Sequence, residues 1–402
     1  MSTRTQVCAW IAAVGLLAPC KAAGQDRTER EVVELILRDG AQAQAIRAGT
    51  EVTRREQLAR LAYPNPSVSY SREGAGFTEF LQAEQSLPLW TRGTLLRAGV
   101  AATAAAEADR DVRLWSLRSD AAATAARVAA GQARLEAAGA HVREVERLIE
   151  VLRIREREGE GSRFDRLRAE QEFREASQLA ASAAVALAEA RAALAGLLPR
   201  DVVVARIVLT PVSAQPAIPI EPLLTRAASA RAELRASQRL RERATLEADA
   251  ARRARLPSPT VFGGLKRADE ASRRDTGGLL GVSVSLPLFD TGGPEAARWE
   301  AERGRVEVER ALVESRIRGE ITGASEVLAV RRTALAHEQP GAADELVQIA
   351  DIAYRDGVAG ILELLDAVRT AARASNRAFD LRLDARLAEI VLEHAVGETL
   401  WP

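Results

Sequence analysis

The sequence predicts a mostly α-helical protein with a small β part, in which one plan of helix, strand pair and long helical hairpin occurs twice. Three observations lead to this prediction. Ala, Leu, Glu and Arg dominate a chain of 402 residues, of which 4% are aromatic, and this composition is typical of long helices. Two short stretches alternate apolar and small polar residues with period two. Landmarks of the first half return about 200 residues later.

The repeated landmarks flank the expected strands and helix turns. Each strand pair is preceded by a Pro-x-Pro motif and followed by a Ser-Leu-Pro-Leu motif, and each long hairpin turns at a glycine. The matching segments are 64–66 with 257–259, Ser86 to Gly93 (SLPLWTRG) with Ser285 to Gly292 (SLPLFDTG), and Gly159 with Gly357. Because these landmarks recur at nearly the same offset, we interpret the chain as a duplication.

Residues 1–24 have the features of a secretory signal peptide. The apolar run over 7–18 is too short to span a bilayer, and small residues follow it. Both cysteines, Cys8 and Cys20, lie in or beside this segment. Cys20 is a candidate for lipid attachment, although Pro19 fits a lipoprotein cleavage site poorly. Cleavage would leave an exported chain without a disulfide framework or a thiol nucleophile.

Residues 25–199 are expected to form the first repeat, with a strand pair within 67–88 and a hairpin tip near Gly159. Proline and glycine clusters mark the ends of its elements. In order, we expect a helix over 27–61, strands over 67–71 and 79–87, and helices over 94–157 and 163–198. At 1.5 Å per residue, the first of the two long helices would be a rod of about 90 Å.

Residues 200–222 contain four prolines, which predicts a linker, and β-branched residues predict a short strand over 202–209. The second repeat, 223–402, then follows the first, with a strand pair within 260–287 and a hairpin tip near Gly357. Its expected elements are a helix over 223–255, strands over 260–265 and 279–286, a polar loop between the strands, and a long helix over 294–353.

Charge and motif content exclude several functions. The chain has 56 basic and 56 acidic residues, and a zero net charge argues against a nucleic-acid partner. His141, His337 and His394 are scattered, so we expect no metal site. The sequence contains no nucleophile–base pairing, phosphate loop or dinucleotide fingerprint. We therefore expect neither an enzyme nor a cofactor.

The strand over 279–286 has one apolar and one small polar face. Val282, Val284 and Leu286 alternate with Ser283 and Ser285, which predicts that the three apolar residues face lipid and the serines face a lumen. Four strands cannot close a barrel, and an open sheet edge cannot lie in lipid. The chain must therefore share its strands with neighbouring copies or keep them out of the membrane. Two copies would supply eight strands and three copies twelve, and small inner residues suit an open lumen.

The duplicated Pro-x-Pro entries, the Ser-Leu-Pro-Leu exits and the glycine turns followed by acidic residues resemble the TolC-like outer membrane factor family. This resemblance covers essentially the whole mature chain. It implies a homotrimer in the outer membrane of a Gram-negative bacterium, with a twelve-stranded β-barrel continued by a periplasmic coiled-coil tunnel. Leu392 to Gly397 (LEHAVG) and Pro340 are similar to the branch that serves heavy-metal and cation exporters.

The resemblance also implies site residues at the tunnel tip. Gly159, Gly161, Gly357 and Gly360 would lie in the turns that contact a periplasmic adaptor protein. Taken alone, these turns are ordinary helix breaks that glycine permits.

The acidic residues after the turns would form the gate. By resemblance, Glu363 and Asp366 fall where the family has carboxylate rings that constrict the closed tip, and Asp165 and Tyr354 fall where it has contacts that lock the gate. Ala359 replaces an arginine that completes this network in some members. For Asp165, the simpler interpretation is a charge that complements the helix dipole.

We expect from the resemblance a passive outer-membrane exit duct of a tripartite efflux system, which docks to the adaptor and to an inner-membrane pump. It would export small toxic compounds or metal cations. The outer component of a type I protein secretion system is an alternative with the same fold, and a periplasmic coiled-coil scaffold or adaptor is an alternative from another class.

Overall fold

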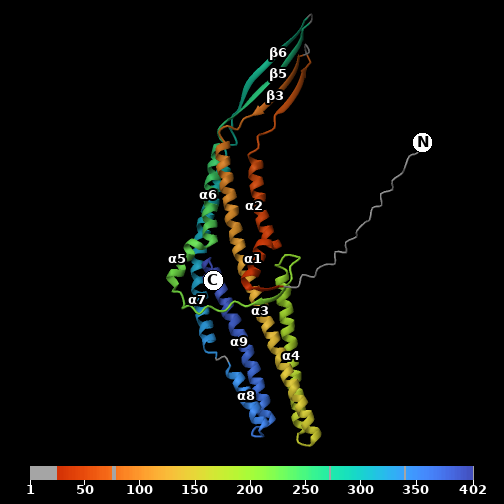
Figure 1. Ribbon diagram of the computed structural model, residues 1–402. Helices are drawn as coiled ribbons and strands as arrows, with labels where there is room; N and C mark the ends of the chain where they lie inside the picture. Colours follow the sequence, from red (N-terminus) through yellow and green to blue (C-terminus); the bar gives the residue numbers. More distant parts are fainter. Residues whose placement is uncertain (1–24, 75–77, 271–272, 339–340, 402) are drawn as a thin grey trace, which may run out of the picture.

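The computed structural model describes residues 25–74, 78–270, 273–338 and 341–401. The predicted signal peptide with Cys8 and Cys20, and also Pro340, lie outside the described residues. The molecule is elongated (Figure 1). A β-sheet forms one end, long helices form the body, and two helical hairpin turns lie together at the opposite end.

Four antiparallel strands form the terminal sheet in the order β2-β3-β5-β6. They are β2 (Ser67–Glu73), β3 (Thr78–Ser86), β5 (Ser258–Glu270) and β6 (Arg273–Ser285). Pairing of β3 with β5 joins the strand pairs of the two repeats. The polar loop predicted between the second pair is wrong, because the backbone ladder of β5 and β6 continues to Glu270 and Arg273. Backbone N–H and C=O groups form the hydrogen bonds of an antiparallel ladder, so polar side chains do not prevent the strands from continuing.

Directly paired residues lie on the same face of the sheet, so the strand register shows which side chains share a face. One face is mainly apolar and the other mainly polar. Val282 is paired with Val261, and Leu265 is paired with Leu81. The apolar face contains Val68, Tyr70, Leu81, Ala83, Val261, Leu265, Leu280, Val282 and Val284. The polar face contains Ser67, Ser69, Gln82, Glu84, Thr260, Gly264, Gly281, Ser283 and Ser285, and it also carries the apolar residues Phe80, Phe262 and Leu279.

The helices form a row in which α3 lies between α2 and α4 on one side and α6 and α9 on the other, with α7 beyond α6 and α9. The first half contains α1 (Glu29–Asp39), α2 (Ala41–Arg60), α3 (Arg92–Glu158) and α4 (Arg163–Ala195). The second half contains α5 (Ile220–Ala230), α6 (Ala232–Arg253), α7 (Gly293–Ala336), α8 (Ala342–Arg355) and α9 (Ile361–Val396). Among the described residues, no helix combines the length and the apolarity needed to cross a membrane.

Each predicted helix that leads into a strand pair is in fact two helices. The helix predicted over 27–61 breaks at Gly40, whose backbone is extended and so close to other segments that a Cβ atom would lie 2.4 Å from the Ile36 carbonyl oxygen. The helix predicted over 223–255 breaks at Arg231, which is 1% exposed. Arg231 donates to the His394 carbonyl oxygen at 2.5 Å and to Glu320 at 2.5 Å. Tertiary contacts of the two break residues therefore override local helix propensity.

The helix predicted over 294–353 is also divided, into α7 and α8. The short strand predicted within 202–209 is confirmed as β4 (Val204–Val208). It pairs in parallel with β1 (Gln25–Thr28), a strand that was not predicted from the sequence. Together with α1, α5 and the linker, these strands cover the middle of the helical body (Figure 1).

A buried charge cluster ties this middle region to α9. Arg386 of α9 donates to Glu29 of α1 at 2.8 Å and to Glu389 at 3.0 Å. Glu389 also accepts from Arg332 of α7 and from the backbone N–H of Ser213 in the linker, both at 2.8 Å. Two carboxylates and two guanidinium groups make the cluster neutral, so each buried charge has a partner.

Candidate gate and conduction path

The two hairpin tips are sharp turns that only glycine adopts without strain. Gly159, between α3 and α4, has φ 80°, and Gly357, between α8 and α9, has φ 72°. Ser162 then caps α4 by accepting from the backbone N–H of Phe164 at 3.1 Å. Gly360 occupies the N-cap position of α9. The four predicted tip glycines, Gly161 included, thus lie in or next to the two turns at the free end of the molecule (Figure 1).

An apolar cluster packs the two hairpins against each other above these turns. Helices α3 and α9 contribute equally, each with a stripe at helical spacing, and α4 provides one alanine. Its buried members are Val145, Leu148, Ile149, Leu152, Ala169, Ile361, Leu364, Leu365 and Val368. The tip of one hairpin is therefore positioned by the other.

The predicted constriction residues lie on the other side of α9. Glu363 and Asp366 are exposed, whereas Leu364, Leu365 and Val368 are buried in the cluster. In the described parts of the chain, no ion pair involves Glu363 or Asp366. Both carboxylates are therefore free to face solvent or a neighbouring copy.

The predicted lock residues are not joined to each other. Asp165 lies half-buried in the first turn of α4, and within the described ranges no hydrogen bond links it to Tyr354. Tyr354 instead meets Arg155 of α3, whose guanidinium carbon lies 4.8 Å from the centre of the ring. Arg155 thus brings a positive charge to Tyr354 from the other hairpin, while Ala359 lies half-buried in the turn after α8. Sequence reasoning missed Arg155 because nothing local distinguishes it from the neighbouring arginines.

A buried ion pair farther from the tips was also missed. Glu172 of α4, 3% exposed, accepts from the Nε of Arg369 of α9 at 3.0 Å to one carboxylate oxygen and 3.3 Å to the other, and the Nη2 of Arg369 also contacts it. These hydrogen bonds raise the pKa of the Arg369 guanidinium. His141 of α3 lies nearby, and burial lowers its pKa, with Arg369 adding to the shift and Glu172 opposing it.

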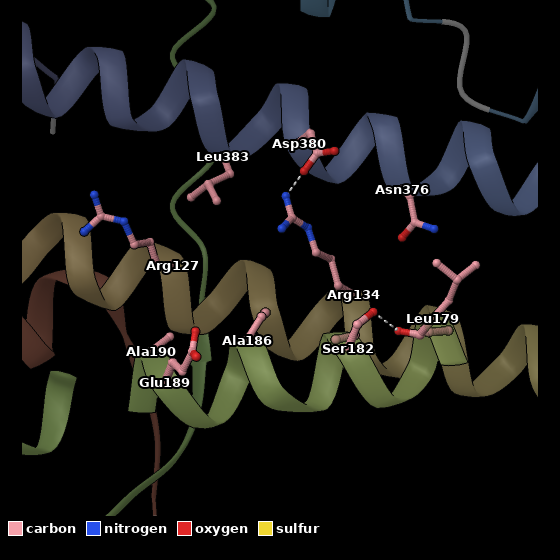
Figure 2. A pocket seen from close by; sticks show the side chains of 13 residues that line it. Arg127, Arg134, Leu179, Ser182, Ala186, Glu189, Ala190, Asn376, Asp380 and Leu383 are labelled. Carbon is pink, nitrogen blue, oxygen red and sulfur yellow. Dashed lines mark hydrogen bonds and ion pairs between the residues drawn. The ribbon is translucent and has the colours of Figure 1, made fainter. Parts of the chain in front are cut away.

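A groove of about 650 Å³ opens between α4 and α9, with α3 along its base. Figure 2 shows Arg134 of α3 directed across the groove to Asp380 of α9, with which it forms an ion pair. The polar lining residues are Arg127, Arg134, Ser182, Glu189, Asn376 and Asp380.

The groove faces away from the segments that cover the middle of the body. On α3, Gln132 bonds to β4, donating to the Ala205 carbonyl at 2.9 Å and accepting from the Ile207 N–H at 3.0 Å. Arg134 lies two residues further along α3 and therefore points to nearly the opposite side. The molecule thus has an outer side covered by the linker and an inner side lined by charged residues.

On the sheet, the side chains of the predicted lipid-facing residues are all exposed. Val282 and Val284 lie on the apolar face of β6, and Leu286 follows the end of the strand; all three are exposed. The side chains of Ser283 and Ser285 lie on the other face.

Comparisons with known proteins extend these observations. Residues 223–398 match the family model described as "Outer membrane efflux protein". No curated protein matches the sequence significantly. Solved structures, in contrast, match nearly the whole chain.

Three of these structures are outer-membrane channels or transmembrane channel proteins. The CmeC outer membrane channel of Campylobacter jejuni has a TM-score of 0.72 at 15% identity, over 93% of this chain and 87% of that one. The MtrE channel of Neisseria gonorrhoeae, in its open state, has a TM-score of 0.68 at 21% identity, over 92% and 89%. CusC, whose structures concern folding and transmembrane channel formation, has a TM-score of 0.64 at 18% identity, over 92% of each chain.

Proposed function

Because this chain belongs to the outer membrane efflux protein family, we propose that it is the passive exit duct of a tripartite efflux system. It is an outer-membrane protein with the fold of the family's channels. In the proposed duct, three copies form a continuous path through the outer membrane and across the periplasm. The protein performs no chemistry on its substrate, and its mechanism is conduction controlled by a gate.

The observation that supports the proposal most strongly is that each unpaired edge of the sheet continues into an edge of the helical row. The sheet ends at β2 on one side and β6 on the other. Helix α2 leads into β2, and β6 leads into α7, so α2 and α7 continue these edges along the body. Unpaired strand edges cannot lie in lipid. Joining β6 and α7 of one copy to β2, α2 and α4 of the next satisfies both edges, and such head-to-tail contacts generate a ring.

Three copies supply twelve strands, a number that can enclose a channel. The apolar face of each sheet then contacts lipid and the serine-rich face lines the lumen. The inner side of the helical body, with the groove of Figure 2, lines the tunnel.

The proposed docking surface for the adaptor consists of the two tips. Phe164 is 61% exposed and Val358 is 83% exposed, and two leucines of the following helices, Leu167 and Leu362, are also exposed. Apolar side chains that project from polar helix turns are a common sign of a protein interface. An inner-membrane pump would then deliver small toxic compounds or metal cations through the docked adaptor.

The proposal is tested by fractionation and by electrical recording. We expect the mature protein in the outer-membrane fraction, as a trimer that resists unfolding in detergent until heated, and as an ion-conducting pore in planar bilayers. Because one copy cannot close a barrel, folding should be coupled to trimer formation. A folded, monodisperse monomer without conductance would contradict the proposal and favour a periplasmic scaffold.

Replacing Val284 with arginine tests the orientation of the sheet. If Val284 faces lipid near the bilayer midplane, the free energy of membrane insertion should become less favourable by about 2–4 kcal/mol per copy. Refolding into lipid vesicles across a urea series measures the change. The control is Ser283→Arg on the opposite face of β6, where the guanidinium would remain in water. Equal losses for both variants would show that the two faces have the same environment.

A further inference from the structure

We propose that the buried ion pair between Glu172 and Arg369 is a latch that holds the two hairpins of each copy together and so keeps the tip of the duct closed. This inference rests on the proposed function, because it assigns these two residues a part in gating. It differs from the predicted gate, which consists of Glu363 and Asp366 as a constriction and of Asp165 and Tyr354 as a lock.

The pair lies where α4 and α9 converge. Leu179 of α4 and Asn376 of α9 line the groove of Figure 2. Glu172 and Arg369 lie about two helical turns nearer to the tips on the same two helices, at equivalent heptad positions. On the side of the pair away from the tips, α4 and α9 are separated by the groove. On the side of the pair nearer to the tips, the apolar cluster that includes Leu365 packs the hairpins together. The ion pair therefore closes the end of the groove.

The latch joins two helices that otherwise have few charged contacts. Between α4 and α9, this is the one ion pair within the described residues. The remaining contacts between the hairpins run mainly through α3, by its apolar stripe and by Arg155 at Tyr354. If the tip opens by separation of α9 from α4, the Glu172–Arg369 pair must break, whereas contacts within each hairpin can persist.

Burial makes this pair suited to the role. The Glu172 side chain is 4% exposed and the Arg369 side chain 32%, and several hydrogen bonds join them. The Arg134–Asp380 pair spans α3 and α9 higher in the groove, but its aspartate is 59% exposed. Exposed ion pairs contribute little, whereas breaking a buried pair leaves an uncompensated charge in a dry site. If one partner is removed, the other charge is unpaired in the closed arrangement and gains water only on opening, so loss of either partner favours the open arrangement.

The experiment compares Glu172→Gln and Arg369→Gln with wild-type trimer in planar bilayers. We expect the ratio of open to closed channels to rise about tenfold or more in either variant, as for the loss of one well-formed buried ion pair. The exchanged double variant, Glu172→Arg with Arg369→Glu, should recover part of the closed state. Glu150→Gln is the matched control and should leave the ratio unchanged, because the Glu150–Arg153 pair is exposed and lies within α3.

A second measurement does not depend on conductance. Spin labels at Arg163 and Val358 report the separation of the two tips, because both residues are exposed next to the turns. In the glutamine variants we expect a longer or broader distance distribution, while the thermal unfolding midpoint shows whether the fold is retained. Unchanged label distances and unchanged gating would overturn the latch. A wild-type protein that does not conduct would refute the duct, and the label distances would still decide whether this pair holds the hairpins together.

Discussion

Replacing Arg386 with methionine is expected to destabilise the protein by about 3–5 kcal/mol, because a buried ion pair loses one partner. Arg386 joins Glu29 to Glu389, and both glutamates are buried. Without Arg386, the one hydrogen bond left to the Glu29 carboxylate from the described residues is a long one, 3.4 Å from the backbone N–H of Thr210. Chemical denaturation followed by circular dichroism measures the loss.

Two further variants show whether the loss comes from the unpaired charge. Adding Glu29→Gln to the Arg386 variant removes that charge and should restore part of the stability. Arg30→Met breaks an exposed pair with Glu34 on the same helix and should change stability by about 0.5 kcal/mol or less. If the Arg386 variant is no less stable than the Arg30 variant, the buried cluster does not stabilise the middle region.

Replacing both Glu363 and Asp366 with alanine is expected to abolish most of the cation selectivity of the pore and its block by multivalent cations. In the proposed trimer, six carboxylates surround one axis at the narrow tip. Fixed negative charges there concentrate cations and repel anions, most strongly at low ionic strength. They would also supply the oxygen ligands that divalent cations prefer. Reversal potentials in salt gradients and titration with multivalent cations on the periplasmic side measure both effects.

The matched control removes the same charge from another place on the second hairpin. Asp344 and Glu345 are exposed in the first turn of α8, and replacing both with alanine should leave selectivity nearly unchanged. If the Glu363 and Asp366 variant keeps its full selectivity and block, the constriction lies elsewhere. The assignment of these residues by family resemblance would then be wrong.

The sequence by itself determined the repeated plan of the molecule. The alternation through Val282 and Val284 predicted a strand, and the Pro-x-Pro and glycine landmarks predicted where strands and hairpins begin and turn. Each of these signals depends on neighbours a few residues apart, because side-chain periodicity and special backbone angles are local properties. The ends of elements were less predictable where local signals and tertiary contacts disagree. The helix break at Arg231 is an example, because the Arg231 guanidinium group donates a hydrogen bond to the backbone carbonyl oxygen of His394, which is distant in sequence.

Only the tertiary structure decided which charged residues act together. With 56 basic and 56 acidic residues, the sequence offers far more possible ion pairs than the fold contains, and most of the observed ones are exposed. Glu29 and Arg386 are 357 positions apart, and Glu172 and Arg369 are 197 apart. No local pattern marks such partners, because their pairing depends on helices that meet only after folding. The free energy of burying a charge cannot be predicted from the sequence either, since burial depends on how the folded chain packs.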